Sequence, residues 1–163
     1  MWLTLTRDYT RCPVPEYALL QRYVGQGGTY TDCYRAALPD AVSLTQLIET
    51  FYTTPLFWAE RTLLQIVLRR RITTADVTAL AQAKADRFAV WRVEARTDQE
   101  ILLVDISGHT RSYLAVRGAS VFFGSAVVAA SDAPLPKLAT LTLPFHRQYS
   151  KALLGEALRA LWA

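Results

Sequence analysis

The chain is poor in the residues that build metal centres and disulfide frameworks. Its 163 residues include two cysteines, Cys12 and Cys33, and two histidines. The cysteines have no C-x-x-C spacing and no histidine pair lies near them, so we expect no zinc site, and we expect no cofactor. A single disulfide between them is formally possible. Disulfides are typical of secreted proteins, however, and nothing else in the sequence suggests secretion. Two reduced thiols are the preferred expectation.

Long apolar runs are missing as well. The most apolar window, residues 56–68, contains Glu60, Arg61 and Gln65 and is too short to cross a bilayer. The first ten residues lack a charged stretch followed by a long apolar one, which is the pattern of a signal peptide. We therefore expect a soluble, cytoplasmic protein with no stable membrane insertion.

Charge of one sign does not dominate the chain. The 18 basic and 14 acidic residues give a formal net charge of +4, and the basic residues are scattered apart from the run at 69–71. Three arginines at a helix end complement the helix dipole more often than they form a nucleic-acid site. We expect no nucleic-acid partner.

Signature motifs of several large enzyme classes are absent from the sequence. It contains no phosphate-binding loop, no dinucleotide fingerprint and no H-E-x-x-H zinc motif. Ser125 follows Gly124 but lacks the G-x-S-x-G frame of a nucleophile elbow. We interpret this segment as a strand with a bulge or a close approach at Gly124. Enzymes of those classes are excluded.

The sequence does have the composition of a globular protein. Apolar residues make up 52% and charged residues 20% of a chain that is long enough to bury a sizeable core. No internal repeat, low-complexity tract or domain boundary stands out. We expect a single domain over residues 1–163.

The first half of the chain mixes short strands with three helices. Ser43 with Gln46 forms a capping box, and Thr54 before Pro55 is a second start signal. The second helix is apolar around most of its circumference and should be among the most buried. The expected elements are a weak strand at 2–6, a short helix at about 16–23, a strand at 29–37, and helices that follow Ser43, span 55–70, and span 74–85 after a cap at Thr73 or Thr74.

The second half changes from helical to strand periodicity. Four strands are expected at 88–96, 100–106, 110–117 and 121–129, with tight connections that make neighbours antiparallel. After a proline-rich connection, an amphipathic helix at 145–162 ends the chain. The predicted fold class is α+β. An antiparallel meander sheet grips the long C-terminal helix, and a block of helices is inserted after an early strand.

Side-chain alternation also predicts a register for the two central strands. A three-residue turn at 107–109 would pair Leu102 with Leu114. The same register would place Asp105 opposite Arg111 on the less apolar face, where we expect a cross-strand ion pair.

A resemblance to known proteins rests on five stretches: YTDCYRAALP (30–39), DRFAVWRVEART (86–97), ILLVDISGHTRSYLAV (101–116), FGSAVV (123–128) and PFHRQYSKALL (144–154). In these segments the chain resembles an uncharacterised bacterial family of domains of unknown function. The order of elements resembles the START-like (SRPBCC) superfamily, which has the helix-grip fold. That resemblance implies a cavity between the curved sheet and the final helix, suited to a hydrophobic or aromatic molecule.

Several side chains are candidates for lining such a cavity. Tyr30, Asp32 and Tyr34 share one face of their strand, where the carboxylate and its flanking tyrosines either bind a ligand or pack the sheet edge. His146 is either a pocket acid/base or a structural residue near the helix start, and we favour the structural interpretation. The aromatic residues either line the cavity or belong to ordinary core. The candidate set is Tyr30, Asp32, Tyr34, Trp91, Tyr113, His146 and Tyr149.

Three functions fit this pattern. We prefer a small-molecule-binding domain, without catalysis or with weak catalysis, that holds a hydrophobic or aromatic ligand under the C-terminal helix. The second is a cofactor-independent enzyme of the cyclase or hydratase sort, with acids and bases such as Asp32, Tyr34 or His146. The third is a domain that associates with a partner, or with a second copy as a homodimer, through an uncovered apolar sheet face. The residues of that face would be Ile101, Leu103 and Tyr113.

Overall fold

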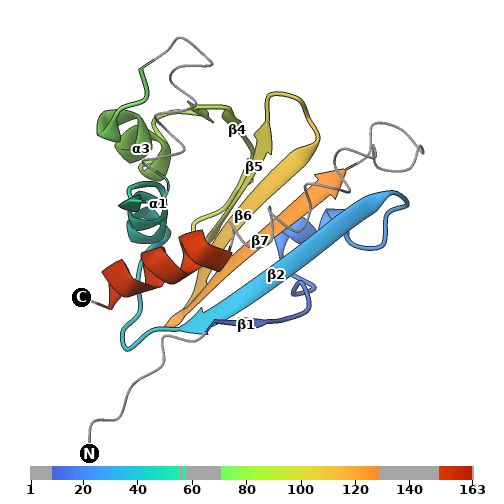
Figure 1. Ribbon diagram of the computed structural model, residues 1–163, viewed down its shortest axis with the longest axis horizontal. Coiled ribbons are helices and arrows are strands. Elements are labelled where there is room, and N and C mark those ends of the chain that lie inside the picture. Colours follow the sequence, from blue (N-terminus) through green and yellow to red (C-terminus); the bar gives the residue numbers. More distant parts are fainter. Residues whose placement is uncertain (1–8, 56, 58–70, 129–150, 163) are drawn as a thin grey trace, which may run out of the picture.

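The computed structural model describes residues 9–55, 57, 71–128 and 151–162. In this part of the chain a seven-stranded antiparallel sheet has the order β1-β2-β7-β6-β5-β4-β3 (Figure 1). The strands are β1 (Tyr9–Arg11), β2 (Thr29–Ala37), β3 (Arg87–Phe88), β4 (Trp91–Arg96), β5 (Glu100–Asp105), β6 (Thr110–Arg117) and β7 (Ser120–Val128). The helical elements are the 3-10 helix η1 (Leu19–Tyr23), α1 (Leu44–Tyr52), α3 (Thr74–Ala81) and a C-terminal helix at 151–161.

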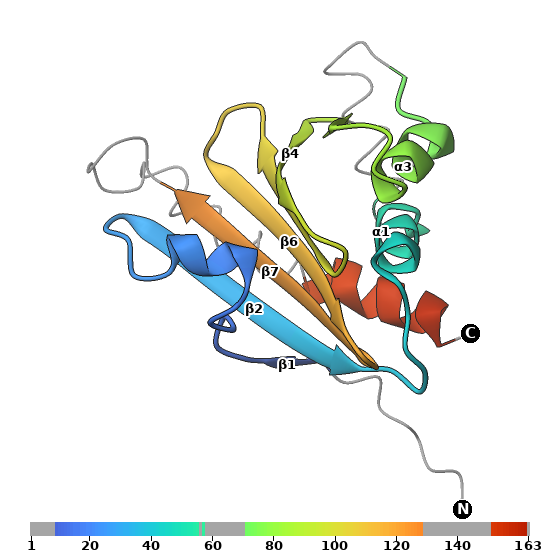
Figure 2. The ribbon, with the colours of Figure 1, turned by 180° about the vertical axis from the view of Figure 1, so that it is seen from behind.

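The sheet is the middle layer of the described structure. The helices α1, α3 and 151–161 pack on one face, which we call the inner face (Figure 1). The segment 12–24, which contains η1 and which we call the outer cover, lies over the other face (Figure 2). This arrangement confirms the predicted α+β class and the sheet that grips a C-terminal helix.

The inner face carries the larger hydrophobic core. Apolar side chains of β2, β5, β6 and β7 alternate toward the helices because successive residues of a strand point to opposite faces. The C-terminal helix contributes the apolar stripe that its periodicity predicts. Its buried members are Leu153, Leu154, Ala157 and Leu158.

The outer face carries a second, smaller core under the outer cover. Leu20 of η1 is fully buried against Leu102, Tyr113 and Ala115 of the sheet. Side chains of both parities in β5 and β6 are therefore buried, which makes these strands nearly continuous apolar runs. The predicted association surface is wrong for this reason. Ile101 and Leu103 belong to the inner core and Tyr113 to the outer one, so they neither share a face nor reach solvent.

Local start signals predict two of the helices correctly. Ser43 and Gln46 form both hydrogen bonds of the capping box before α1, and Thr73 and Asp76 do the same before α3. The third helix is shorter than the expected 74–85. It ends at Ala81, where the Arg96 guanidinium donates to the carbonyls of Leu80 and Ala81 over 2.6 Å each.

The strand expectations hold with local differences. The strand at 29–37 is confirmed residue for residue as β2. The strand expected at 88–96 is divided into β3 and β4 at Ala89, whose φ of 52° turns the chain. The short helix near 16–23 is the 3-10 helix η1, and β1 was not predicted. The expected strand at 2–6, the connection at 131–144 and nearly all of the helix at 55–70 lie outside the described residues.

The predicted register of β5 against β6 is wrong by one residue. Leu102 lies opposite Tyr113 and Ile101 opposite Leu114, because the connection has four residues, 106–109, rather than three. Asp105 does not pair with Arg111. Its carboxylate accepts hydrogen bonds from the Thr110 backbone N–H and the Ser107 hydroxyl, which closes the turn. A consequence of the corrected register is that Ile106 is 74% exposed.

Gly124 of β7 is the point where the outer cover approaches the sheet most closely. A Cβ atom there would lie 2.6 Å from the Leu20 side chain and 2.9 Å from the Asp32 carbonyl oxygen, both too close. Because a backbone atom is one of the two, the crowding cannot be relieved by a side-chain rotation alone.

The first prediction concerns this contact. Gly124→Ala should lower the free energy of unfolding by about 1–3 kcal/mol, since it overpacks the outer core. The measurement is urea denaturation followed by circular dichroism. Gly27→Ala is the matched control, because its Cβ would meet no atom within 4 Å, and it should change stability by less than about 0.5 kcal/mol. Equal midpoints for the two variants would show that the contact does not constrain the fold.

Candidate functional site

A buried carboxylate lies on the inner face of the sheet, near the edge formed by β1 and β2. Asp32 of β2 is 2% exposed, and its carboxylate accepts hydrogen bonds from the backbone N–H of Ser125 at 3.1 Å and from its hydroxyl at 2.6 Å. The Tyr30 hydroxyl donates to the other carboxylate oxygen over 3.3 Å. Among the described residues, no ion pair within 4.0 Å involves Asp32. A buried carboxylate is therefore stabilised here by neutral donors.

This arrangement follows from strand pairing. Asp32 lies directly opposite Ser125 in the antiparallel pairing of β2 with β7, and Ser125 lies opposite Ser112 of β6. The three side chains thus form a polar row across adjacent strands. Ser112 and the Tyr52 hydroxyl of α1 are 3.5 Å apart and both are buried. We call Tyr30, Asp32, Ser125, Ser112 and Tyr52 the polar row.

Of the predicted site residues, three come together on β2. Tyr30, Asp32 and Tyr34 share the inner face, as alternation predicted. Tyr34 is buried in the inner core, where its ring meets Tyr9 edge-on with centroids 5.9 Å apart. The ammonium of Lys151, at the first described residue of the C-terminal helix, lies 5.8 Å from the Tyr34 ring centroid. The C-terminal helix therefore lies beside Tyr34, two positions along β2 from Asp32 of the polar row.

The structure does not bring the remaining candidates to this group. Trp91 is on β4, four strands from β2 in the sheet order, which corresponds to about 19 Å at the usual strand spacing. Tyr113 faces the outer core. His146 and Tyr149 lie outside the described residues. Ser125, Ser112 and Tyr52 were not among the candidates, because only the long-range strand pairing and the position of α1 place them near Asp32.

Tyr113 belongs instead to a polar group that holds the outer cover. Glu100 of β5 is 4% exposed, and its carboxylate accepts hydrogen bonds from the Tyr113 hydroxyl at 2.8 Å and the Leu19 backbone N–H at 3.1 Å. Arg117 forms an ion pair with it at 3.3 Å. Burial, and next the hydrogen bond and charge of Glu100, raise the pKa of Tyr113 far above its usual value. This contact is structural, because every donor aimed at the carboxylate comes from the sheet or from η1.

A second group of charged side chains attaches the end of η1. The Tyr23 hydroxyl donates to the Glu94 carboxylate, which also accepts a hydrogen bond from Arg111 at 3.0 Å. The Arg111 guanidinium lies 4.7 Å from the Tyr23 ring centroid, so it contacts both partners. Burial, followed by the hydrogen bond to Glu94, raises the pKa of Tyr23. The two groups together fix the outer cover on the sheet.

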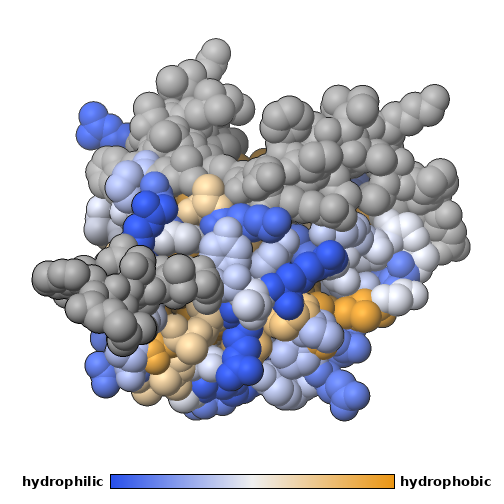
Figure 3. All heavy atoms as spheres, turned by 60° about the horizontal axis from the view of Figure 1, so that its bottom comes forward, coloured by the Kyte–Doolittle hydropathy of each residue, from blue (hydrophilic) through white to orange (hydrophobic). Residues whose placement is uncertain are grey.

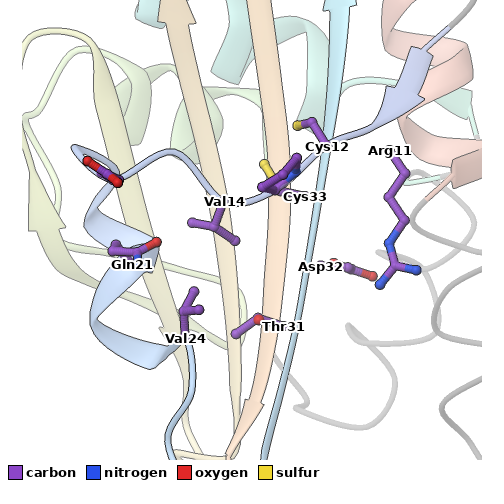
Figure 4. Close-up of a pocket in the computed structure, with 10 residues that line it drawn as sticks. Arg11, Cys12, Val14, Gln21, Val24, Thr31, Asp32 and Cys33 are labelled. Atoms are coloured by element: carbon purple, nitrogen blue, oxygen red, sulfur yellow. The ribbon is translucent and has the colours of Figure 1, made fainter.

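A pocket lies at the free edge of β2, where β1 ends. Its volume is about 680 Å³, within the range of small-molecule sites. It lies between the outer cover and β2 (Figure 4), and the buried Oε1 atom of Gln21 has no hydrogen-bond partner among the described residues. The lining residues are Arg11, Cys12, Pro13, Val14, Glu16, Gln21, Val24, Thr31, Asp32 and Cys33.

Metal ligands do not gather anywhere in the part of the chain that the structure describes. No group of three or more His, Cys, Asp and Glu side chains there could hold an ion. His109 lies on the β5–β6 connection, and its Nδ1 is 3.2 Å from the Val128 carbonyl oxygen. Among the described helices, none is long and apolar enough to span a membrane.

Apolar surface is limited on the face drawn in Figure 3. Small apolar patches are separated by hydrophilic side chains there. Among the described residues, the exposed large hydrophobic side chains are Tyr17, Val24 and Ile106. The Arg117 guanidinium lies over Tyr17, 4.6 Å from the centroid of the tyrosine ring. These residues do not form the broad apolar face that a stable association through the sheet would need.

Comparison with known proteins finds similar solved structures. The chain is similar to a solved structure titled "Crystal structure of Ara h 8.0201", with 13% sequence identity and a TM-score of 0.36. The match covers 81% of this chain and 99% of that chain. No family model matches the sequence, and no curated protein matches it.

The second prediction tests whether Tyr113 is structural. Tyr113→Phe removes a donor to the buried Glu100 carboxylate, so the free energy of unfolding should fall by about 1–3 kcal/mol near neutral pH. The stability of the wild type should also fall above pH 10, which is the ordinary pKa of tyrosine. Above that pH the Tyr113 phenol ionises in the unfolded chain, whereas the folded chain keeps it protonated.

The measurement is urea denaturation at several pH values between about 8 and 11. The loss of stability above pH 10 should be smaller in Tyr113→Phe than in the wild type. Parallel pH profiles for the two proteins would contradict the assignment, because other tyrosines contribute equally to both.

Proposed function

We propose that this protein binds a small, largely apolar or aromatic molecule on the inner face of the sheet, beside the C-terminal helix. The observation that supports this is the polar row: a buried carboxylate and its hydroxyl neighbours within an otherwise apolar surface. Small-molecule sites are typically mostly apolar, with a few polar groups that fix the orientation of the ligand. The long sheet and the helix that crosses it supply the apolar part.

The polar row also suggests which ligands bind best. Asp32 accepts hydrogen bonds and, when ionised, donates none, so it favours a hydroxyl or amine donor on the ligand. Tyr30 is half-buried and adds a hydroxyl beside it. A phenol or a similar amphipathic molecule matches this combination, with its apolar body on the core side chains and its donor on Asp32.

Binding is favoured over the two alternative functions. For an enzyme, a carboxylate such as Asp32 needs a second acid or base within hydrogen-bond reach, whereas the hydrogen-bond partners described above are the Tyr30 hydroxyl and the hydroxyl and backbone N–H of Ser125. For an association domain, an exposed apolar sheet face is needed, and the proposed members of that face are buried. Ligand binding at the polar row needs neither a catalytic partner for Asp32 nor a second protein chain.

The third prediction uses 2-naphthol and 2-methoxynaphthalene as probes, since they differ by the hydroxyl donor. Both should displace from the protein the fluorescent dye 8-anilino-1-naphthalenesulfonate, an anion whose aromatic rings bind apolar surfaces. 2-Naphthol should bind about tenfold more tightly, because a hydrogen bond to a charged acceptor contributes more than 1 kcal/mol. Native mass spectrometry of the protein purified from its own host should also detect a bound molecule of this class.

Asp32→Asn should abolish most of the preference for 2-naphthol. Glu100→Gln is the matched control: it also neutralises a buried carboxylate, but on the outer face of the sheet, so the preference should remain. If neither naphthalene binds and no molecule co-purifies, the proposed function is wrong. If both bind equally in wild type and Asp32→Asn, ligand binding stands and the role of Asp32 is wrong.

A further inference from the structure

The two cysteines, 21 positions apart in the sequence, meet at the edge of the sheet. The pairing of β1 with β2 places Arg11 opposite Tyr34. The same register, continued by one residue, places Cys12 opposite Cys33. The Cys12 backbone N–H donates to the Cys33 carbonyl over 2.9 Å, so the pairing extends to this position. Residues directly opposite each other in antiparallel strands place their side chains on the same face of the sheet.

The separation of these residues suits a disulfide. Cα atoms of directly opposite residues lie about 4.5–5.5 Å apart, and disulfides span about 4.4–6.8 Å. Both residues are free cysteines in this structure. Figure 4 shows both sulfur atoms at the pocket beside β2, on the side of the strand that faces the outer cover. The Cα separation expected for this pairing therefore falls within the range that a disulfide spans.

The two thiols differ in access. Cys12 is partly exposed and lines the pocket, whereas Cys33 is buried at 1% exposure. Burial, followed by the charge of Cys12 and a hydrogen bond with its side chain, raises the pKa of Cys33 well above its usual value. Cys33 is thus shielded by burial, whereas Cys12 meets molecules that enter the pocket. Thiolate character and exposure decide which cysteine is oxidised first.

We propose that Cys12 and Cys33 form a redox-active dithiol, which hydroperoxides convert to a disulfide across the β1–β2 edge. Cys12 reacts first and Cys33 resolves the product. This inference does not depend on ligand binding by the polar row. Both thiols lie on the outer side of β2, whereas the side chains of the polar row lie on its inner face, and Asp32 is the one member of that row that also lines the pocket.

The chemistry takes two steps. The Cys12 sulfur attacks one oxygen of hydrogen peroxide, so that an S–O bond forms, the O–O bond breaks and water leaves, which oxidises Cys12 to a sulfenic acid. The Cys33 sulfur then attacks the Cys12 sulfur. An S–S bond forms, the S–O bond breaks, and a second water leaves with the thiol proton of Cys33. Two thiols and one peroxide give one disulfide and two waters.

The fourth prediction tests this with hydrogen peroxide on the purified full chain. With alkylation carried out on the denatured protein, so that the buried Cys33 is accessible, both thiols should be resistant after peroxide treatment. The intact mass should fall by two hydrogen atoms, reversibly with dithiothreitol. Trypsin cuts after Arg11, Arg22 and Arg35, so the disulfide should join peptides 12–22 and 23–35. Peptide mapping also separates oxidation of Met1, the single methionine, from reaction at cysteine.

Two variants separate the roles of the thiols. In Cys33→Ala, Cys12 should stop at the sulfenic acid, so dimedone labelling should exceed that of the wild type by at least about tenfold. In Cys12→Ala, the buried Cys33 should remain reduced. Circular dichroism under reducing conditions establishes that each variant is folded. The proposal is overturned by equal dimedone labelling of wild type and Cys33→Ala, by a disulfide between two chains, or by two thiols that remain alkylatable after peroxide treatment.

Discussion

The pairing of β2 with β7 is the constraint on which the rest of the structure depends. All nine residues of β2 lie opposite residues of β7, which come more than 80 positions later in the chain. This pairing joins the early strand to the end of the meander and so gives one continuous sheet. It also places Asp32 opposite Ser125 and Cys33 opposite Gly124, so that a polar row lies on one face and a close approach of the outer cover on the other. The polar row and the close approach at Gly124 are therefore consequences of a single register.

The sequence predicts the features whose causes are local. The capping boxes at Ser43 and Thr73 are complete within four residues, and the limits of β2 follow from alternation up to Pro39. The register of β5 and β6 was predicted wrongly because both faces of these strands are buried, so that apolar alternation no longer identifies which face is inside. The turn was decided instead by the hydrogen bond from the Thr110 N–H to Asp105, which lengthens the connection by one residue.

Only those members of the candidate site that lie close together in the sequence could be predicted. Tyr30, Asp32 and Tyr34 share a face by simple period-two geometry, and the structure confirms that grouping. Ser125 and Tyr52 join them through contacts across 93 and 60 residues respectively, for which a single sequence holds no signal. The outer cover was missed for a related reason. Its attachment depends on Glu100 and Glu94, whose role as acceptors for η1 follows from tertiary contacts and not from residue type. The fold class of this protein can therefore be predicted from the sequence pattern alone, whereas the hydrogen-bond partners within each site cannot.

The outer cover also gives the protein two layers of unequal cohesion. The inner layer joins several helices to the sheet through an extensive apolar core. The outer cover contains the short 3-10 helix η1 and contributes few buried apolar side chains, chiefly Ala18 and Leu20. Local opening of a segment needs only the free energy of its own contacts, which is less than that of global unfolding. We therefore expect the outer cover to open locally at a lower free-energy cost than the helix side of the sheet. Backbone amide protons under the outer cover would exchange with solvent through this local opening. Cys33 would become exposed in the same opening, without unfolding of the sheet.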